Sequence, residues 1–132
     1  MTAPATASHL NYLKHVLRKD IAFNTTGIAS GIVMGALPSG AVITAVEVLI
    51  TTVFNAATTN VLTVGTAATA DLYLAAADVA EDSLGLTRYV GKAAKLAAAT
   101  EITVSYTQTG TAATTGAASV MVEYVVDPAA YT

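Results

Sequence analysis

The chain of 132 residues has no cysteine and no tryptophan, and only 11% of its residues are charged. Without cysteine there can be no disulfide, no thiolate nucleophile and no zinc–thiolate site. An average soluble domain has about 25% charged residues. A free monomer relies on surface charge for solubility, so the low share predicts that a partner or further copies of the chain cover part of the surface.

The few charges are unevenly distributed along the chain. Residues 1–19 hold Lys14, Arg18 and Lys19 without any acid, whereas the remainder has three basic residues and nine acids. This difference predicts an N-terminal arm over residues 1–19 and a single domain over residues 20–132. Three basic residues are too few to indicate nucleic acid as a partner. The first residues also lack the basic and apolar regions of a signal peptide.

The longest apolar run extends from Ala41 to Phe54 and contains one charge, Glu47. It is too short for a transmembrane helix, which needs about 20 apolar residues, so we expect no membrane partner. Most of its residues are β-branched, which favours a strand. Alternation predicts that Glu47 and Thr51 lie on a mixed outer face together with Ile43, Ala45, Leu49 and Val53. The predicted core face consists of Val42, Thr44, Val46, Val48, Ile50, Thr52 and Phe54.

Other segments show the same alternation or the same enrichment in β-branched residues. We predict further strands over residues 18–24, 31–36, 60–66, 86–90, 101–108 and 118–127. Their number and spacing indicate an all-β protein, a β-sandwich of about eight strands.

The connections between these segments predict local pairing. Short polar connections indicate one hairpin between residues 41–54 and 60–66, and a second between residues 101–108 and 118–127. In the second hairpin, Tyr106 and Tyr124 would pack across the paired strands.

Two segments favour a helix instead of a strand. Residues 70–80, where Asp71 can cap a first turn, and residues 92–99 are rich in good helix formers. Both are too short to be stable without packing, so we expect one or two short helical turns.

Side chains that could carry catalysis are scarce. His9 and His15 are the only histidines and both lie in the arm, and no serine stands in a G-x-S-x-G elbow. The acids of residues 71–82 form either a solvated loop or a weak divalent-ion site, because they lack the spacing of a calcium loop. We therefore expect no enzymatic activity, no cofactor and no dedicated metal site.

Three successive segments resemble small structural proteins of tailed-bacteriophage virions, in particular capsid decoration (cement) proteins. They read HLNYLKHVLRKDIAFN, GALPSGAVITAVEVLITTVFNAATTNVLTVGT and ADLYLAAADVAE. The most specific part is the turn LPSG, followed by a long strand, a short Asn/Thr connection and a second strand. The resemblance covers residues 10–127 and implies a jelly-roll-like sandwich.

The resemblance also implies a place and partners. Such a protein lies on the capsid exterior, bridges subunits of the major capsid protein and forms a dimer or trimer. An extended arm can dock by adding a strand to an exposed sheet edge of its partner. The candidate docking residues are Leu10, Tyr12, Leu13, Lys14, His15, Arg18 and Lys19.

Two alternatives to a decoration protein remain open. One is a phage tail or head-fibre component that attaches to the host surface. The other is a carbohydrate-binding β-sandwich, although the chain has no tryptophan on which a sugar could stack.

Overall fold

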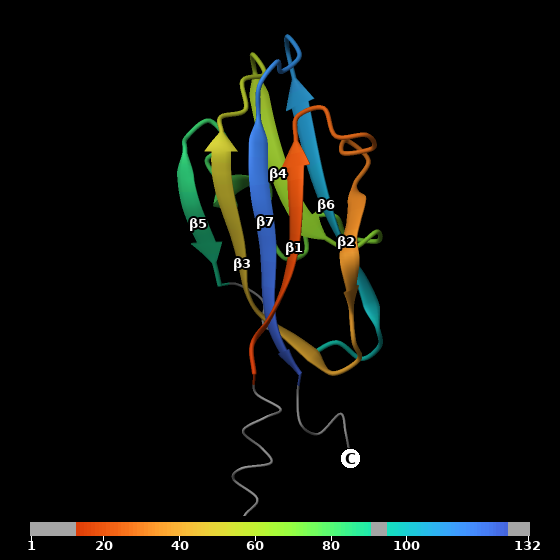
Figure 1. Ribbon diagram of the computed structural model, residues 1–132. Coiled ribbons are helices and arrows are strands. Elements are labelled where there is room, and N and C mark those ends of the chain that lie inside the picture. The colour runs from red at the N-terminus through yellow and green to blue at the C-terminus, as the bar shows by residue number, and fades with distance from the viewer. Residues whose placement is uncertain (1–12, 91–94, 127–132) are drawn as a thin grey trace, which may run out of the picture.

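A computed structural model describes residues 13–90 and 95–126. These residues form seven strands and one turn of 3-10 helix (Figure 1). The strands are β1 (His15–Ala22), β2 (Ile32–Leu37), β3 (Ala41–Thr52), β4 (Thr59–Gly65), β5 (Gly85–Tyr89), β6 (Thr100–Thr109) and β7 (Ala117–Val126), and the helical turn is η1 (Ala76–Asp78).

The strands form two antiparallel sheets that pack face to face. Sheet A has the order β1-β7-β3-β5 and sheet B the order β2-β6-β4. The inward-facing side chains of both sheets form one apolar core, which confirms the predicted all-β sandwich. Its largest fully buried members are Tyr106, Phe54, Leu37, Leu62, Leu74 and Ile102.

The strand pairing follows a jelly roll. Leu74 forms an isolated bridge with Val64 of β4, on the edge of β4 that faces away from β6. Leu74 can be counted as the remnant of a further strand between β4 and β5, which gives eight strands in chain order. The first of these then pairs with the eighth (β1 with β7), the second with the seventh (β2 with β6), the third with the sixth (β3 with β5) and the fourth with the fifth (β4 with Leu74). Rolling this ribbon brings β7 beside β3 and β6 beside β4, and so creates the two sheets.

Both predicted hairpins are wrong, because the strands concerned lie in different sheets. β3 belongs to sheet A and β4 to sheet B, and β6 and β7 are divided in the same way. The short polar connections arch across the sandwich, whose sheets lie about 10 Å apart, instead of turning within one sheet. In the first connection Phe54 is buried, with its ring centroid 4.6 Å from that of Tyr106.

Tyr106 and Tyr124 are consequently not cross-strand neighbours. Tyr106 packs on Phe54, whereas Tyr124 stacks on His15 of β1 with ring centroids 5.2 Å apart. Gly116, in the connection from β6 to β7, leaves room for Phe54, since a Cβ at this position would clash with the Phe54 ring.

A β-bulge in β3 changes the predicted core face. The register with β7 shifts between Ile43 and Ala45, so Ile43 is buried while Val42 and Thr44 are half-buried. After this bulge the prediction is correct for Val46, Val48, Ile50 and Phe54, and Glu47 points outward. It is wrong for Thr52, which is exposed after a second register shift between Ile50 and Thr52. A bulge adds one residue to one strand and thereby reverses the alternation, which a strict period of two does not anticipate.

The helical predictions hold only for one turn. In residues 70–80 just Ala76–Asp78 is helical, and it is Asp78, not Asp71, whose carboxylate accepts the hydrogen bond of a preceding backbone N–H, that of Ala75, at 2.8 Å. Of residues 92–99 the described part is not helical. There Leu96 exchanges backbone hydrogen bonds of 2.8 Å with Gly40 and Ala41, and this tertiary pairing outweighs the helix propensity of a short segment.

Candidate interaction surfaces

The predicted docking arm is partly built into sheet A. Leu10 and Tyr12 lie outside the described residues, but His15 to Lys19 belong to β1 and pair with β7. The predicted boundary after residue 19 therefore falls inside a strand. Leu13, which precedes the strand, is 56% exposed.

β1 carries its charges in a way that suits an edge strand. Arg18 pairs with Asp20 at 3.1 Å on the outer face. Lys19 stands opposite Val120, a core residue, so it lies on the inward side of β1 and is nevertheless exposed. An inward-pointing lysine at an edge is a device by which natural sheets hinder pairing with a further strand.

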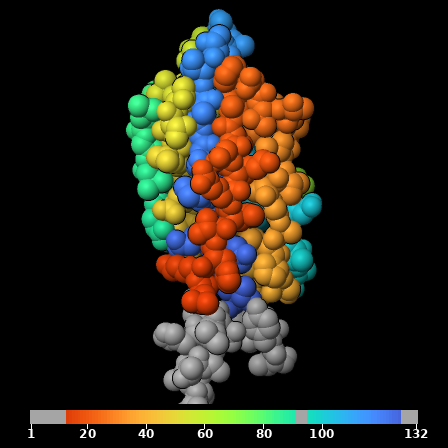
Figure 2. Space-filling model, in the orientation of Figure 1, coloured from red at the N-terminus to blue at the C-terminus, as the bar shows by residue number. Residues whose placement is uncertain are grey.

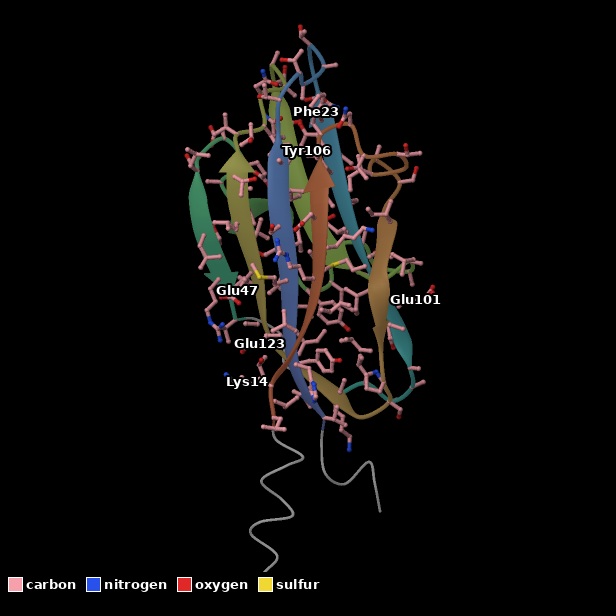
Figure 3. The ribbon with its side chains drawn as sticks, viewed as in Figure 1. Lys14, Phe23, Glu47, Glu101, Tyr106 and Glu123 are labelled. Atoms are coloured by element: carbon pink, nitrogen blue, oxygen red, sulfur yellow. The ribbon has the colours of Figure 1, made fainter. Side chains whose placement is uncertain are left out.

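A network of charges joins β7, β3 and β5 with Lys14, the residue that precedes β1, across the outer face of sheet A. Its centre is Glu123 of β7, which contacts Lys14 Nζ at 3.2 Å and Arg88 Nη2 of β5 at 3.3 Å. Arg88 also reaches Glu47 of β3 at 3.5 Å, and the hydroxyl of Thr44 donates to Glu123 at 2.9 Å. Figure 3 shows Lys14, Glu47 and Glu123 gathered on this sheet.

The same contacts control the ionisation of Glu123. Hydrogen bonds from Arg88, Thr44 and Lys14 lower the pKa of Glu123 to about 2. Opposite charge in turn raises the pKa of Arg88 above its usual value, chiefly through the hydrogen bond to Glu123. Glu123 is thus ionised at neutral pH, and its charge is paired within the network.

Exposed apolar side chains concentrate around β5. Leu84 is 68% exposed, Leu86 59% and Val90 65%. Leu49 of β3 stands directly opposite Leu86 and is itself 37% exposed. We call these four residues the β5 margin. Among the described strands β5 is an edge strand of sheet A, seen at the left of Figure 2.

The outer face of sheet B is lined by hydroxyl groups. Thr63 and Ser105 stand opposite each other on β4 and β6 with their oxygens 2.6 Å apart, and Thr59 and Thr109 form a similar pair at 2.7 Å. Glu101 is the charged residue of this face, and it lies well away from the network of sheet A (Figure 3).

Two of the four acids of residues 71–82, Asp78 and Glu81, make hydrogen bonds within the fold. Glu81 is 6% exposed, and its Oε2 accepts the backbone N–H of Leu62 in β4 at 2.8 Å. Burial raises the pKa of Glu81 above its usual value, although the hydrogen bond from Leu62 opposes this change. A cavity of about 350 Å³ lies beside Glu81, between Thr58–Val61 and Val79–Asp82.

Within residues 13–90 and 95–126, no three histidine or acidic side chains come together as a group that could hold a metal ion. The weak divalent-ion site considered for the acidic segment is therefore not assembled. Of the two histidines, His15 stacks on Tyr124, and His9 lies outside the described residues. No helix in the described part of the chain is long and apolar enough to cross a membrane.

No protein-family model matches the sequence, and no curated protein does so either. Two solved structures match the fold. One is a chain of "Cyanophage Pam1 capsid asymmetric unit", with a TM-score of 0.67 and 23% identity over 89% of this chain and 87% of that one. The other belongs to "Acidic stable capsid structure of Helicobacter pylori bacteriophage KHP30", with a TM-score of 0.64 and 18% identity over 88% of this chain and 90% of that one.

Both chains share the fold of this protein. The aligned part makes up nearly nine tenths of each chain in both pairs, so the aligned chains are similar in length. At this level of sequence identity the likeness concerns the sandwich and its topology. Individual surface residues are not transferred by it.

Proposed function

We propose that this protein is a structural component of a phage virion that binds the outside of the head as a decoration (cement) protein. In that role it contacts the major capsid protein, bridges neighbouring subunits and stabilises the shell, without acting as an enzyme. The observation that supports this proposal best is the fold shared, nearly end to end, with chains of two phage capsid structures.

The composition and the surfaces agree with such a role. Charged residues amount to only 11% of the chain, and several polar side chains of each outer face pair with one another. A surface of this kind loses little hydration energy when a partner covers it. The proposed protein acts as a dimer or trimer, since multivalent attachment strengthens weak individual contacts with a shell.

Binding to heads of the parent phage that lack this protein tests the proposal. The purified chain should co-sediment with such heads and reach saturation at a stoichiometry set by the symmetry of the shell. Decorated heads should also resist heat or chelators better than bare heads. Binding to cells or glycans, in the absence of binding to heads, would favour a tail or fibre component instead.

The structure allows a sharper test of the docking arm. Removal of residues 1–19 would strip most of β1 from β7, whereas removal of residues 2–12 retains β1 and the contact of Lys14 with Glu123. We expect this shorter truncation to fold and to lose binding to heads. Removal of residues 2–8, which spares Leu10 and Tyr12, is the matched control and should retain binding. If the chain lacking residues 2–12 still occupied all binding sites on the heads, the proposal that the arm docks on the head would be wrong.

A further inference from the structure

The two edges of sheet A are built differently. β1 carries Arg18, Lys19 and Asp20, including the inward-pointing lysine that hinders strand addition. β5 carries a single charge, Arg88, which is already engaged by Glu47 and Glu123. The pairing of β5 with β3 has no bulge, and no hydrogen bond from the described residues covers the opposite edge of β5.

Among the residues that the structure describes, the largest group of exposed apolar side chains lies along this edge. Leu84, Leu86 and Val90 are each more than half exposed within a stretch of seven residues. Soluble monomers usually protect an edge strand with charge or proline and avoid contiguous apolar patches beside it. A protein chain is therefore the occupant that the β5 margin fits best, because it can supply both backbone hydrogen bonds and apolar contacts.

The distribution of charge favours a second copy of this chain as that occupant. The outer face of sheet A carries three basic and three acidic side chains, all in ion pairs, and its formal charge is zero. The whole chain has a net charge of −3, so its excess negative charge lies elsewhere. Two copies can thus approach each other at this face without the like-charge repulsion that other contacts between them would bring.

We propose that the β5 margins of two copies meet around a two-fold axis, with β5 of one copy antiparallel to β5 of the other. This arrangement extends sheet A from one copy into the next and is self-complementary, as a two-fold interface requires. If Thr87 lies on the axis, Leu84 of each copy stands opposite Val90 of the other. Leu86 then stands opposite Arg88, whose aliphatic stem can cover it. The inference refines the oligomer of the proposed decoration protein and rests on that proposal for its biological setting.

The oligomeric state in solution tests this surface without any phage particle. We expect wild-type protein to associate in light scattering and sedimentation, and Leu86→Glu to raise the dissociation constant at least tenfold. Val33→Glu is the matched control, because Val33 is 47% exposed on β2 of sheet B, and it should associate like wild type. If Leu86→Glu does not fold, as judged by circular dichroism, Leu84→Glu replaces it in the same measurement. Leu84 precedes β5, so its substitution should disturb the strand less.

A cysteine substitution tests the register. The chain has no cysteine, so Thr87→Cys introduces a single thiol that should form a disulfide-linked dimer on mild oxidation, and Val33→Cys should not. Equal cross-linking of both variants, or a wild-type protein that stays monomeric at every concentration, would overturn the inference. If monomeric wild type binds heads and Leu84→Glu does not, the β5 margin contacts the shell protein, and the proposed function stands without this dimer.

Discussion

The β4 edge of sheet B and the β5 edge of sheet A differ in how far the chain covers their backbone. At β4, the edge of sheet B, Leu74 bonds to Val64 and the carboxylate of Glu81 accepts the N–H of Leu62, so the chain covers much of its own edge. At β5, the corresponding edge of sheet A, the backbone has no such cover among the described residues, and leucine and valine side chains surround it. The β4 edge of sheet B is thus covered by its own chain, whereas the β5 edge of sheet A is one that another chain can cover.

The outer faces differ in the same sense. Pairs of hydroxyl groups on sheet B satisfy each other at 2.6 and 2.7 Å, and each pair links only two neighbouring strands. On sheet A the contacts of Glu123 link β7 with β3, with β5 and with the residue that precedes β1. A face that carries several mutually dependent charges resists deformation as a unit, which suits the sheet that receives an external contact.

The largest expected effect comes from the covered edge of sheet B. Replacement of Glu81 by alanine leaves the buried N–H of Leu62 without its acceptor, and we expect the free energy of unfolding to fall by about 1–3 kcal/mol. Chemical denaturation measures this loss.

Two variants control for the role of Glu81. Glu81→Gln keeps an oxygen that can accept the N–H of Leu62 and should lose less stability than the alanine variant. Asp82→Ala removes the neighbouring exposed carboxylate and should have little effect. Equal losses for Glu81→Ala and Glu81→Gln would show that the hydrogen bond to Leu62 does not hold this edge.

The next effect concerns the charged network of sheet A. Glu123→Ala removes the acceptor shared by Lys14, Arg88 and Thr44, and we expect a loss of about 1–2 kcal/mol, because charge-assisted hydrogen bonds exceed ordinary surface ion pairs. Glu101→Ala, on the outer face of sheet B, is the control and should be neutral within about 0.5 kcal/mol. A double-mutant cycle with Arg88→Ala should reveal non-additivity, and strictly additive losses would argue against a network.

The dependence of stability on pH should separate the two sheets. Between about pH 4.5 and 2, folded protein keeps Glu123 ionised while the unfolded chain takes up a proton, so the free energy of unfolding falls with acidification. Glu81 has the opposite effect on stability, because burial raises its pKa in the folded protein. The stability that Glu81 contributes is therefore lost as the pH rises above the ordinary pKa of a glutamate.

Glutamine variants assign these two slopes. Glu123→Gln should flatten the acid side of the stability profile, and Glu81→Gln the side above pH 4.5. Thermal unfolding over a series of buffers measures both. An unchanged acid slope in Glu123→Gln would mean that other carboxylates govern acid unfolding.

The sequence predicted much of this fold for clear physical reasons. Alternation and β-branching identify strands reliably where one face is buried, as in β3 after its bulge and in β6. Pairing was not predictable in the same way, because a short polar connection can turn within a sheet or cross between sheets. The outcome depends on buried residues such as Phe54, which anchors its connection in the core.

The candidate surfaces were harder to foresee. Glu47 was correctly placed on the outer face of its strand, but its relation to Arg88 and Glu123 depends on which strands flank β3. The exposure of Leu84, Leu86 and Val90 likewise follows from the position of β5 at a sheet edge. The only sequence signal for this edge is a nearly uncharged segment, SLGLTRYV, directly after an acidic one.

The smallest effect is expected on the hydroxyl face of sheet B. Thr63→Val leaves the buried Ser105 hydroxyl without its partner, at a cost of about 1 kcal/mol, and Ser105→Ala should cost less because half-buried Thr63 can reach water. The double variant Thr63→Val, Ser105→Ala should recover most of the loss, since removal of both partners leaves no unsatisfied group. Such recovery would distinguish the hydroxyl pairs from the charged network of sheet A. There, removal of both Arg88 and Glu123 takes away the ion-pair partners of Lys14 and Glu47, so no comparable recovery is expected. If the double variant instead loses as much as Glu123→Ala, the hydroxyl pairs stabilise their sheet as strongly as the charged network does, and the contrast between the two faces fails.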